Sequence, residues 1–210
     1  MLQKLATALI AVVVSLPLGA SVGSSAFAEG AKGNPVRVRG SIVSFDGQSL
    51  KVKTREGETV DVALASGWTV SSVTRMSLTD VKPGDYVGIA SLPAKAGGDG
   101  ALEVLIFPPA MKGLGEGSYG WDLKPNSTMT NATVADAVKG VDGRTVTVTY
   151  HGKEKKIAVP EGTPVVTLAP ATAADLKPDA MVFVPAEKDA GGAISAQRIV
   201  VGANGVVPPM

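Results

Sequence analysis

The residues that could perform nucleophilic or acid–base chemistry are few in this chain. It has one histidine, His151, and no cysteine. Nucleophilic catalysis needs a nucleophile, a base and an orienting group within reach of one another. His151 lies in Tyr150-His-Gly-Lys153, at a predicted hairpin tip, and neither Gly-x-Ser-x-Gly nor Ser-x-x-Lys occurs. We therefore predict that His151 is a solvated turn residue and that Ser-His-Asp hydrolysis is absent.

Paired carboxylates offer a second route, to general acid–base or glycosidic chemistry. The nearest pairs are Asp80 with Asp85 and Asp175 with Asp179, and both flank prolines in turn-like sequence. Aspartate in such a position usually hydrogen-bonds to its own backbone. We therefore expect a protein that is not an enzyme and that uses no cofactor, with a hydrolase as the remote alternative.

Transition-metal binding requires clustered His, Cys, Asp or Glu side chains, or soft sulfur ligands that converge. With one histidine and no cysteine, only methionines could supply soft ligands. Met111, Met129 and Met210 lie outside the regular strands that the sequence predicts. With His151 they form a hypothetical copper(I) site. A periplasmic, copper-type metal-handling accessory protein is therefore the alternative function.

A binding site in the segment 110–131 is the more direct hypothesis. The segment is rich in glycine, carries Tyr119 and Trp121, and ends in a polar cluster. A flexible linker would be rich in Gly and Ser without bulky aromatics, so we expect an ordered connector that docks on a folded domain. An aromatic side chain with polar neighbours at a domain junction is a common binding arrangement. The candidate binding residues are Tyr119, Trp121, Asp122, Asn126, Thr128 and Asn131.

A structural role for this connector is the competing interpretation, in which Trp121 only packs the connector onto the first domain. Under the binding hypothesis, the protein is a non-enzymatic periplasmic binding or structural protein. Its partner would be a small ligand, a cell-envelope component or another protein.

An internal repeat organises the rest of the chain, with an offset of roughly 95 residues. The segment 43–50 matches 139–146, and 78–87 matches 173–182, in the same order along the chain. Segment 110–131 has no counterpart. The chain therefore contains two similar domains, which we predict at 35–109 and 132–203, with a tail at 204–210.

Within each copy the hydrophobic period is two, which is typical of β-strands with one solvated face. Leu50 and Val52, for example, alternate with Lys51 and Lys53. Asp-Gly pairs at 46–47 and 142–143 predict tight hairpin turns, and the aspartates at 80 and 175 predict a turn or a single helical turn. About six short strands per copy must close on themselves or pack on a second sheet to protect their edges. We therefore predict an all-β fold of two tandem closed or partly closed barrels that resemble an oligonucleotide/oligosaccharide-binding barrel.

The N-terminus has the three parts of a secretory signal. A basic start through Lys4 precedes an apolar run, and Ala26-Phe-Ala28 forms a cleavage site. We predict a signal peptide over 1–28, cleaved after Ala28, and a periplasmic location. An uncleaved anchor is the alternative, and no membrane span is expected in the mature chain. Removing Lys4 leaves 19 basic residues and 19 acidic ones, so no nucleic-acid partner is expected.

The stretch Asp80-Val-Lys-Pro-Gly-Asp-Tyr-Val87 resembles a domain of unknown function that recurs, often in tandem, in exported bacterial proteins. The resemblance covers most of the mature chain and implies export and the tandem β fold. Some members of that family carry a label that connects them to metal transporters. The second copy departs from the pattern, because Asp179-Ala180 replaces Gly84-Asp85.

Overall fold

The computed structural model describes residues 33–94, 97–140 and 143–208, and its regular structure is almost entirely β. The predicted signal peptide and the pair Val141-Asp142 lie outside the described residues. The strands are β1 (Asn34–Phe45), β2 (Ser49–Thr54), β3 (Thr59–Arg75), β4 (Tyr86–Pro93), β5 (Asp99–Ile106), β6 (Gly117–Trp121), β7 (Ser127–Gly140), β8 (Gly143–Tyr150), β9 (Lys153–Pro160), β10 (Val165–Pro170), β11 (Met181–Lys188) and β12 (Ile194–Gly202). Three short 3₁₀ turns cover Leu78–Asp80, Pro109–Met111 and Ala173–Asp175. The prediction of an all-β fold is confirmed.

The local structure follows from residue types that the sequence makes visible. On β2, Leu50 and Val52 are fully buried whereas Lys53 is exposed. The β1–β2 turn is fixed by the Asp46 carboxylate, which accepts hydrogen bonds from the backbone N–H groups of Gln48 (2.9 Å) and Ser49 (2.7 Å). These bonds hold the pKa of Asp46 below its usual value. Gly47 follows at φ +95°, a conformation that favours glycine.

The paired aspartates form turns, as expected. Asp80 accepts from the backbone N–H of Ser77 at 2.8 Å, and Asp175 accepts from that of Thr172 at 2.7 Å. Each aspartate thereby completes the capping box of a 3₁₀ turn. The departure in the second copy is conservative, because Asp179 takes φ +65° where Gly84 takes φ +92°. Aspartate is among the residues that tolerate this left-handed conformation.

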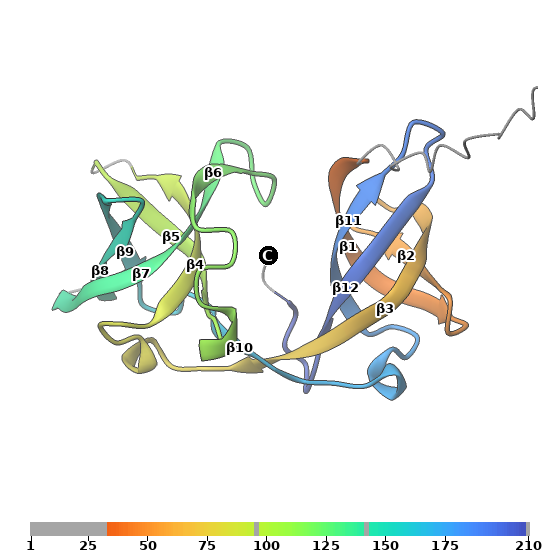
Figure 1. The fold of residues 1–210 in the computed structure, drawn as a ribbon. Coiled ribbons are helices and arrows are strands. Elements are labelled where there is room, and N and C mark those ends of the chain that lie inside the picture. Colours follow the sequence, from red (N-terminus) through yellow and green to blue (C-terminus); the bar gives the residue numbers. More distant parts are fainter. Residues whose placement is uncertain (1–32, 95–96, 141–142, 209–210) are drawn as a thin grey trace, which may run out of the picture. The chain divides into compact units, whose positions relative to one another are not determined.

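Five strands close a β-barrel, which we call group A. The order of pairing is β1–β2–β3–β12–β11, and β11 pairs again with β1. A second cycle of pairings, group B, runs β4–β5–β9–β8–β7 and returns to β4. Its β5–β9 step consists of two residue pairs. Figure 1 shows the labels of each group lying together.

Each group contains strands from both copies of the repeat. Group A combines β1, β2 and β3 of the first copy with β11 and β12 of the second, and group B combines β4 and β5 with β7, β8 and β9. The predicted domain limits, 35–109 and 132–203, therefore do not coincide with the two groups of paired strands. The physical cause lies in β3, a 17-residue strand that continues past its pairing with β2. Its last residues pair with β10 instead, and β10 also pairs with β5 of group B.

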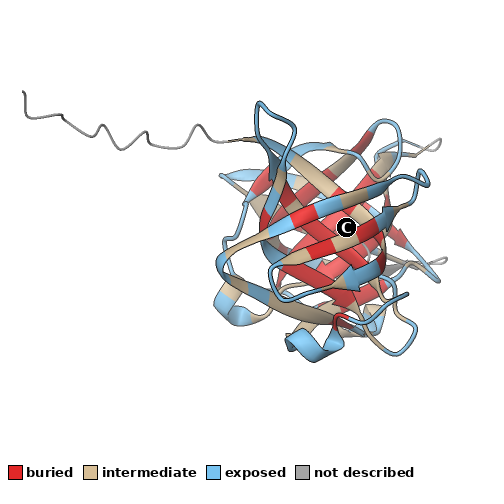
Figure 2. Ribbon diagram, turned by 90° about the vertical axis from the view of Figure 1, so that its right-hand side faces the viewer, coloured by how far each residue is buried: buried red, intermediate tan, exposed pale blue. Residues whose placement is uncertain are grey.

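The hydrophobic core has three parts, and most of the buried residues lie along the strands (Figure 2). Group A is filled by one aliphatic cluster that includes Ile42 and Val184, and group B by another that includes Ile89 and Ile157. The third cluster joins strands of both groups and consists of Val73, Leu105, Val166, Phe183 and Val200, with Phe107, Trp121, Leu168 and Val206 packed against them.

One end of group B carries a layer of polar side chains that face its interior. The layer contains Ser91, Asp99, Thr128, Thr130 and Lys155. Lys155 Nζ lies 2.7 Å from Asp99 Oδ2, 3.2 Å from Thr130 Oγ1 and 3.4 Å from Thr128 Oγ1. Ser91 Oγ lies 3.1 Å from Thr128 Oγ1. Ser91 and Thr130 are fully buried, and the lysine and the aspartate are about one-fifth exposed, at 18% and 22%.

The equivalent layer of group A is entirely apolar. In group B, Thr130 lies opposite Ile89 and Lys155 lies opposite Val148. In the same places of group A, Val38 lies opposite Val184 and Val60 lies opposite Val52. By the same registers, the residues that correspond to Ser91, Asp99, Thr128, Thr130 and Lys155 are Ala186, Ile194, Val36, Val38 and Val60. The fold therefore does not require polar groups at these positions.

This polar layer favours the exchanged pairing of the strands. If each copy closed on itself, Asp99 would lie where Ile194 now lies, beside Val60 and away from Lys155. Lys155 would in turn lie beside Ile194. Two charged groups would then be largely removed from water without a partner, which costs several kcal/mol per ion. The ion pair is thus available only when β5 joins β9.

We expect Lys155→Val to lower the free energy of unfolding by about 2 kcal/mol, because Asp99 is left unpaired. This loss is smaller than for a fully buried pair, because both side chains are about one-fifth exposed. Adding Asp99→Ile restores the apolar layer of group A and should recover most of that loss. Urea unfolding of the two single variants and the double variant measures the coupling. Strictly additive effects would contradict the proposed role of the pair.

Candidate functional site

The segment 110–131, singled out in the sequence, is ordered and contains β6. This strand pairs antiparallel with β7, from Gly117 opposite Asn131 to Trp121 opposite Ser127. The six predicted binding residues lie on or next to these two strands, but they do not form one site. They divide among an aromatic contact with group A, an apolar pocket, a turn and the polar layer of group B.

Trp121 and Asp122 contact two arginines of β1. The Arg37 guanidinium lies 4.0 Å from the centroid of the Trp121 ring, and the Phe183 ring lies 6.3 Å from it. Arg39 donates a hydrogen bond of 2.8 Å to Asp122, and Arg37 lies 3.7 Å from the same carboxylate. Trp121 therefore joins the connector to group A, which is the structural role considered as the alternative to ligand binding.

The charge of Asp122 follows from these contacts. Partial burial acts to raise the pKa of Asp122, but the hydrogen bond from Arg39 and the charges of both arginines outweigh it, and the pKa is lowered. The side chain keeps 48% of its surface exposed. At neutral pH Asp122 is thus a carboxylate held between two guanidinium groups.

Glu103 on β5 is an unexpected neighbour of this cluster. It is 5% exposed, and burial raises its pKa to about 7 in spite of the opposing charges of Arg39 and Arg55. Its Oε1 atom has no hydrogen-bond partner among the described residues. A buried carboxyl group with such a pKa changes charge near neutral pH.

Tyr119 and Asn131 meet at an apolar pocket of about 250 Å³. The Asn131 side-chain amide donates to Tyr119 Oη at 3.1 Å and to the Leu114 carbonyl at 3.2 Å. Burial raises the pKa of Tyr119 above its usual value. The remaining lining residues are mostly apolar and come from β3, β5, β10, β11, β12 and the loop before β6: Thr69, Ser71, Leu105, Phe107, Met111, Leu114, Gly115, Leu168, Phe183, Pro185, Arg198, Ile199 and Val200.

The last two predicted binding residues have different surroundings. Asn126 takes φ +63° in the turn between β6 and β7, a conformation that asparagine tolerates. Thr128 belongs to the polar layer of group B. Asn126 is therefore a turn residue by its geometry.

The predicted metal ligands differ in their exposure and contacts. Met111 lines the apolar pocket, and Met129 is buried on β7 beside Gly88. His151 is exposed in the β8–β9 turn, where its backbone N–H donates to Glu116 Oε1 at 2.9 Å. Met210 lies outside the described residues. Across residues 33–94, 97–140 and 143–208, no group of three His, Cys, Asp or Glu side chains could hold a metal ion.

Several residues at these sites were not identified from the sequence. Arg37 and Arg39 precede Asp122 by more than 80 positions, and Phe183 and Arg198 come from the second copy. They are adjacent to the connector because strands are exchanged between the copies. The alternation of Arg37 and Arg39 with Val36 and Val38 was the one available signal, since it places both arginines on the outer face of β1.

Comparisons with known proteins give no relative for this chain: no family model matches it, and neither does a curated protein or a solved structure. The resemblance to the exported tandem-domain family therefore stays a prediction. In the described part of the chain, no helix has the length and apolar character needed to cross a membrane.

The buried carboxyl group predicts a pH dependence of stability. The pKa of Glu103 is raised in the folded state from 4.5 to about 7, so the folded protein binds this proton more tightly than the unfolded chain does. The associated stability is present below pH 4.5 and is lost as pH rises through 7. The free energy of unfolding should fall by about 3 kcal/mol from this group between pH 4.5 and 8.

Glu103→Gln carries no titrating group and should lack this fall. The measurement is chemical unfolding of both proteins at several pH values, and the difference between their two curves isolates the contribution of Glu103. Parallel curves would show that the group titrates normally.

The aromatic contact predicts a stability effect that is separate from ligand binding. Trp121→Ala removes the packing against Phe183 and the cation–π contact with Arg37. The free energy of unfolding should fall by about 2 kcal/mol, less than for a fully buried tryptophan. Val43→Ala, at an exposed hydrophobic residue, serves as the control and should change it little. An unchanged stability of the Trp121 variant would contradict the assigned role.

Proposed function

We propose that this protein is a non-enzymatic binding protein whose ligand is a small, mainly apolar molecule with one anionic group. The observation that carries the proposal is the apolar pocket where Tyr119 and Asn131 meet. It is lined by Leu114 and Tyr119, two large hydrophobic side chains that remain 38% and 39% exposed. Exposed apolar surface beside a concave site is typical of ligand-binding surfaces.

The chemistry of the pocket supports a ligand of mixed character. Leu105, Leu168 and Val200 supply aliphatic walls. Arg198 supplies a cation, and none of the four ion pairs among the described residues includes it. The Asn131 amide and the Tyr119 hydroxyl supply hydrogen-bonding groups. With about 250 Å³, the pocket suits a ligand smaller than a typical drug-sized molecule.

The setting of this function in the cell follows from the sequence expectations. We place the protein in the periplasm, after cleavage of the predicted signal peptide at Ala28. We treat groups A and B as a tandem of small barrels that together frame the pocket. No catalytic role is proposed for any residue.

Octanoate is a suitable probe, because it combines an aliphatic chain with a carboxylate. Isothermal titration calorimetry should detect its binding to the mature protein. Leu114→Asn and Arg198→Gln should each weaken binding by about 10-fold, since one removes apolar contact and the other the cation. Octanol should bind more weakly than octanoate.

Val43→Asn provides the matched control, because Val43 is a similarly exposed hydrophobic residue outside the pocket. It should bind octanoate like the unaltered protein. Absence of binding, or equal weakening by Val43→Asn and Leu114→Asn, would exclude the proposed site.

A further inference from the structure

We propose a second binding site, for an oxyanion such as a carboxylate or phosphate group, in the arginine pocket of group A. The pocket lies on β1, on the β2–β3 turn and against the connector. It is lined by Arg37, Arg39, Thr54, Arg55 and Asp122, with Val38, Glu56, Val60 and Leu123 completing it. Its volume is about 470 Å³. This site is separate from the pocket at Tyr119, and it does not depend on the function proposed there.

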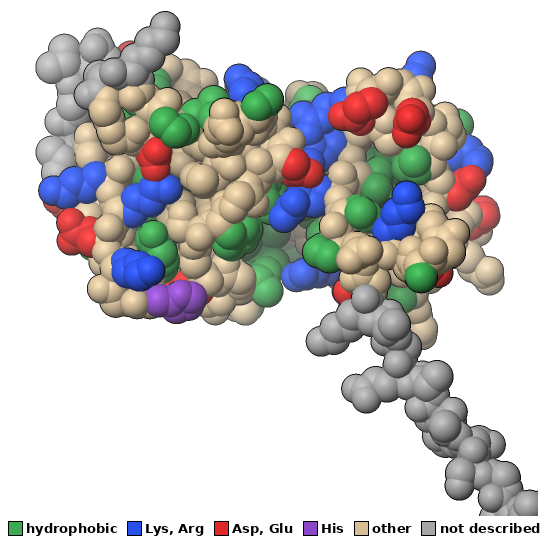
Figure 3. Space-filling view, turned by 90° about the horizontal axis from the view of Figure 1, so that it is seen from above, with side chains coloured by type: hydrophobic (Ala, Val, Ile, Leu, Met, Phe, Trp, Pro, Cys, Tyr) green, Lys and Arg blue, Asp and Glu red, His purple; other side chains and the backbone are tan. Residues whose placement is uncertain are grey.

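The charge of the pocket favours an anion. Three guanidinium groups line it, and Asp122 and Glu56 are the acidic lining residues. Glu103 is under the charge of Arg39 and Arg55, but its pKa of about 7 keeps it largely protonated at a pH below that value. Figure 3 shows basic side chains gathered where the two groups of strands meet. Guanidinium groups bind carboxylates and phosphates through paired, charge-assisted hydrogen bonds.

The contacts of Asp122 show that Arg37 and Arg39 can bind an oxyanion. Its carboxylate takes a hydrogen bond of 2.8 Å from Arg39 and lies 3.7 Å from Arg37. The same carboxylate is half exposed, with 48% of its side-chain surface accessible. An ion pair with so exposed a member contributes at most about 1 kcal/mol. Asp122 is thus a weak, tethered occupant that a stronger oxyanion can displace.

Buried polar atoms provide an independent observation. In the described residues, three buried side-chain N or O atoms have no hydrogen-bond partner: Thr54 Oγ1, Glu103 Oε1 and Trp121 Nε1. Thr54 lines the pocket, Glu103 is under the charge of Arg39 and Arg55, and the Trp121 ring contacts Arg37. Unpaired buried polar atoms are uncommon in native proteins. Of these three residues, Thr54 alone lines the pocket itself, where a polar ligand would give its hydroxyl a hydrogen-bond partner.

The proposed displacement of Asp122 predicts how a change at this residue affects the affinity for anions. Removing the charge of Asp122 leaves the Arg37 guanidinium without its carboxylate neighbour and should strengthen binding of an external anion. A site in which Asp122 helped to hold the ligand would respond in the opposite direction. The direction of the change therefore tests the proposed geometry.

The experiment is isothermal titration calorimetry of the mature protein with inorganic phosphate and, separately, with citrate. Asp122→Asn should bind about 5-fold more tightly than the unaltered protein, as expected when a competing surface ion pair is removed. Arg37→Gln and Arg55→Gln should each weaken binding by about 10-fold. The anion that binds more tightly identifies the class of oxyanion.

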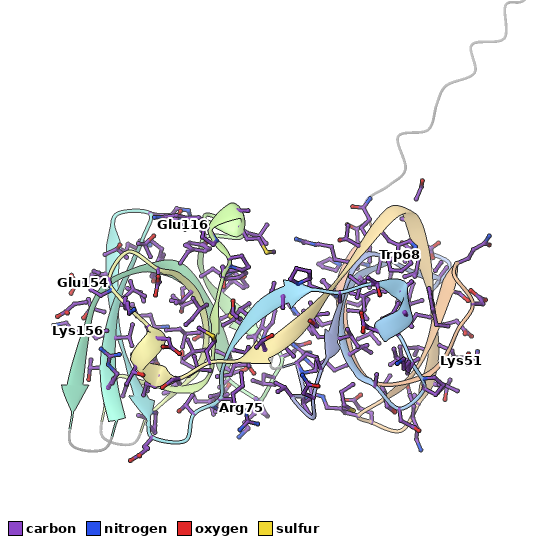
Figure 4. All side chains as sticks on the ribbon, turned by 90° about the horizontal axis from the view of Figure 1, so that it is seen from below. Lys51, Trp68, Arg75, Glu116, Glu154 and Lys156 are labelled. Carbon is purple, nitrogen blue, oxygen red and sulfur yellow. The ribbon has the colours of Figure 1, made fainter. Side chains whose placement is uncertain are left out.

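Lys51→Gln is the matched control for charge. Lys51 also lies on group A, at its outer edge (Figure 4), and pairs with Asp61 at 2.5 Å away from the pocket. This variant should bind like the unaltered protein. Equal weakening by Lys51→Gln and Arg55→Gln would show that only the overall charge of the protein matters, and it would overturn the proposal. Weaker binding by Asp122→Asn, or no binding of either anion, would also overturn it.

The two proposed sites can fail separately. Arg198→Gln should leave phosphate and citrate binding unchanged, and Arg55→Gln should leave octanoate binding unchanged. Circular dichroism of each variant confirms that it is folded, since Arg55 is an exposed turn residue whose replacement should not affect the core.

Discussion

An open strand edge is a liability in a small sheet, and the closing of such edges organises groups A and B. A strand left at an edge presents unpaired backbone groups that favour association with other chains. The three-strand meander β1–β2–β3 leaves both outer strands open on one side. Strands β11 and β12, which arrive from the other copy of the repeat, close both edges. Group B solves the same problem in the same cyclic order.

The exchange of strands determines which residues can meet. The 17-residue β3 carries the chain out of group A, and β10 pairs with its far end. Arg37 and Arg39 consequently lie beside Trp121 and Asp122, which are remote in sequence. Tyr119 of the connector shares a pocket with Arg198 of β12. The pocket at Tyr119 therefore combines residues of both copies and of the connector.

Local features of the fold were predictable from sequence because they depend on neighbouring residues. The alternation of Leu50 and Val52 with lysines, the Asp46-Gly47 turn and the aspartate-capped turns all belong to this class. Tyr119 and Asn131 were identified as binding candidates from the composition of the connector, and they meet at the pocket. The partners of Asp122 were not identified, since no local pattern links β1 to the connector.

The choice of partner strands could not be obtained from the hydrophobic pattern. The two copies have similar strands, so β4 and β11 carry the same alternation and fit the same neighbours. The polar side chains distinguish the two groups of strands. Group B has Asp99 and Lys155 at the positions where group A has Ile194 and Val60. Figure 4 shows Glu154 and Lys156, the chain neighbours of Lys155, on the outer side of β9. In the sequence, Lys155 is one of four consecutive charged residues, Lys153-Glu-Lys-Lys156, and nothing local distinguishes it from the other three.

The exchanged pairing is tested most directly by nuclear Overhauser contacts between strands in the mature protein. In the exchanged arrangement Val38 lies opposite Val184, and Thr130 lies opposite Ile89. If each copy closed on itself, Val38 would instead lie opposite Ile89, and Thr130 opposite Val184. Backbone contacts of Val38 with Val184, and none with Ile89, are the expected result. Contacts of Val38 with Ile89 would contradict the account.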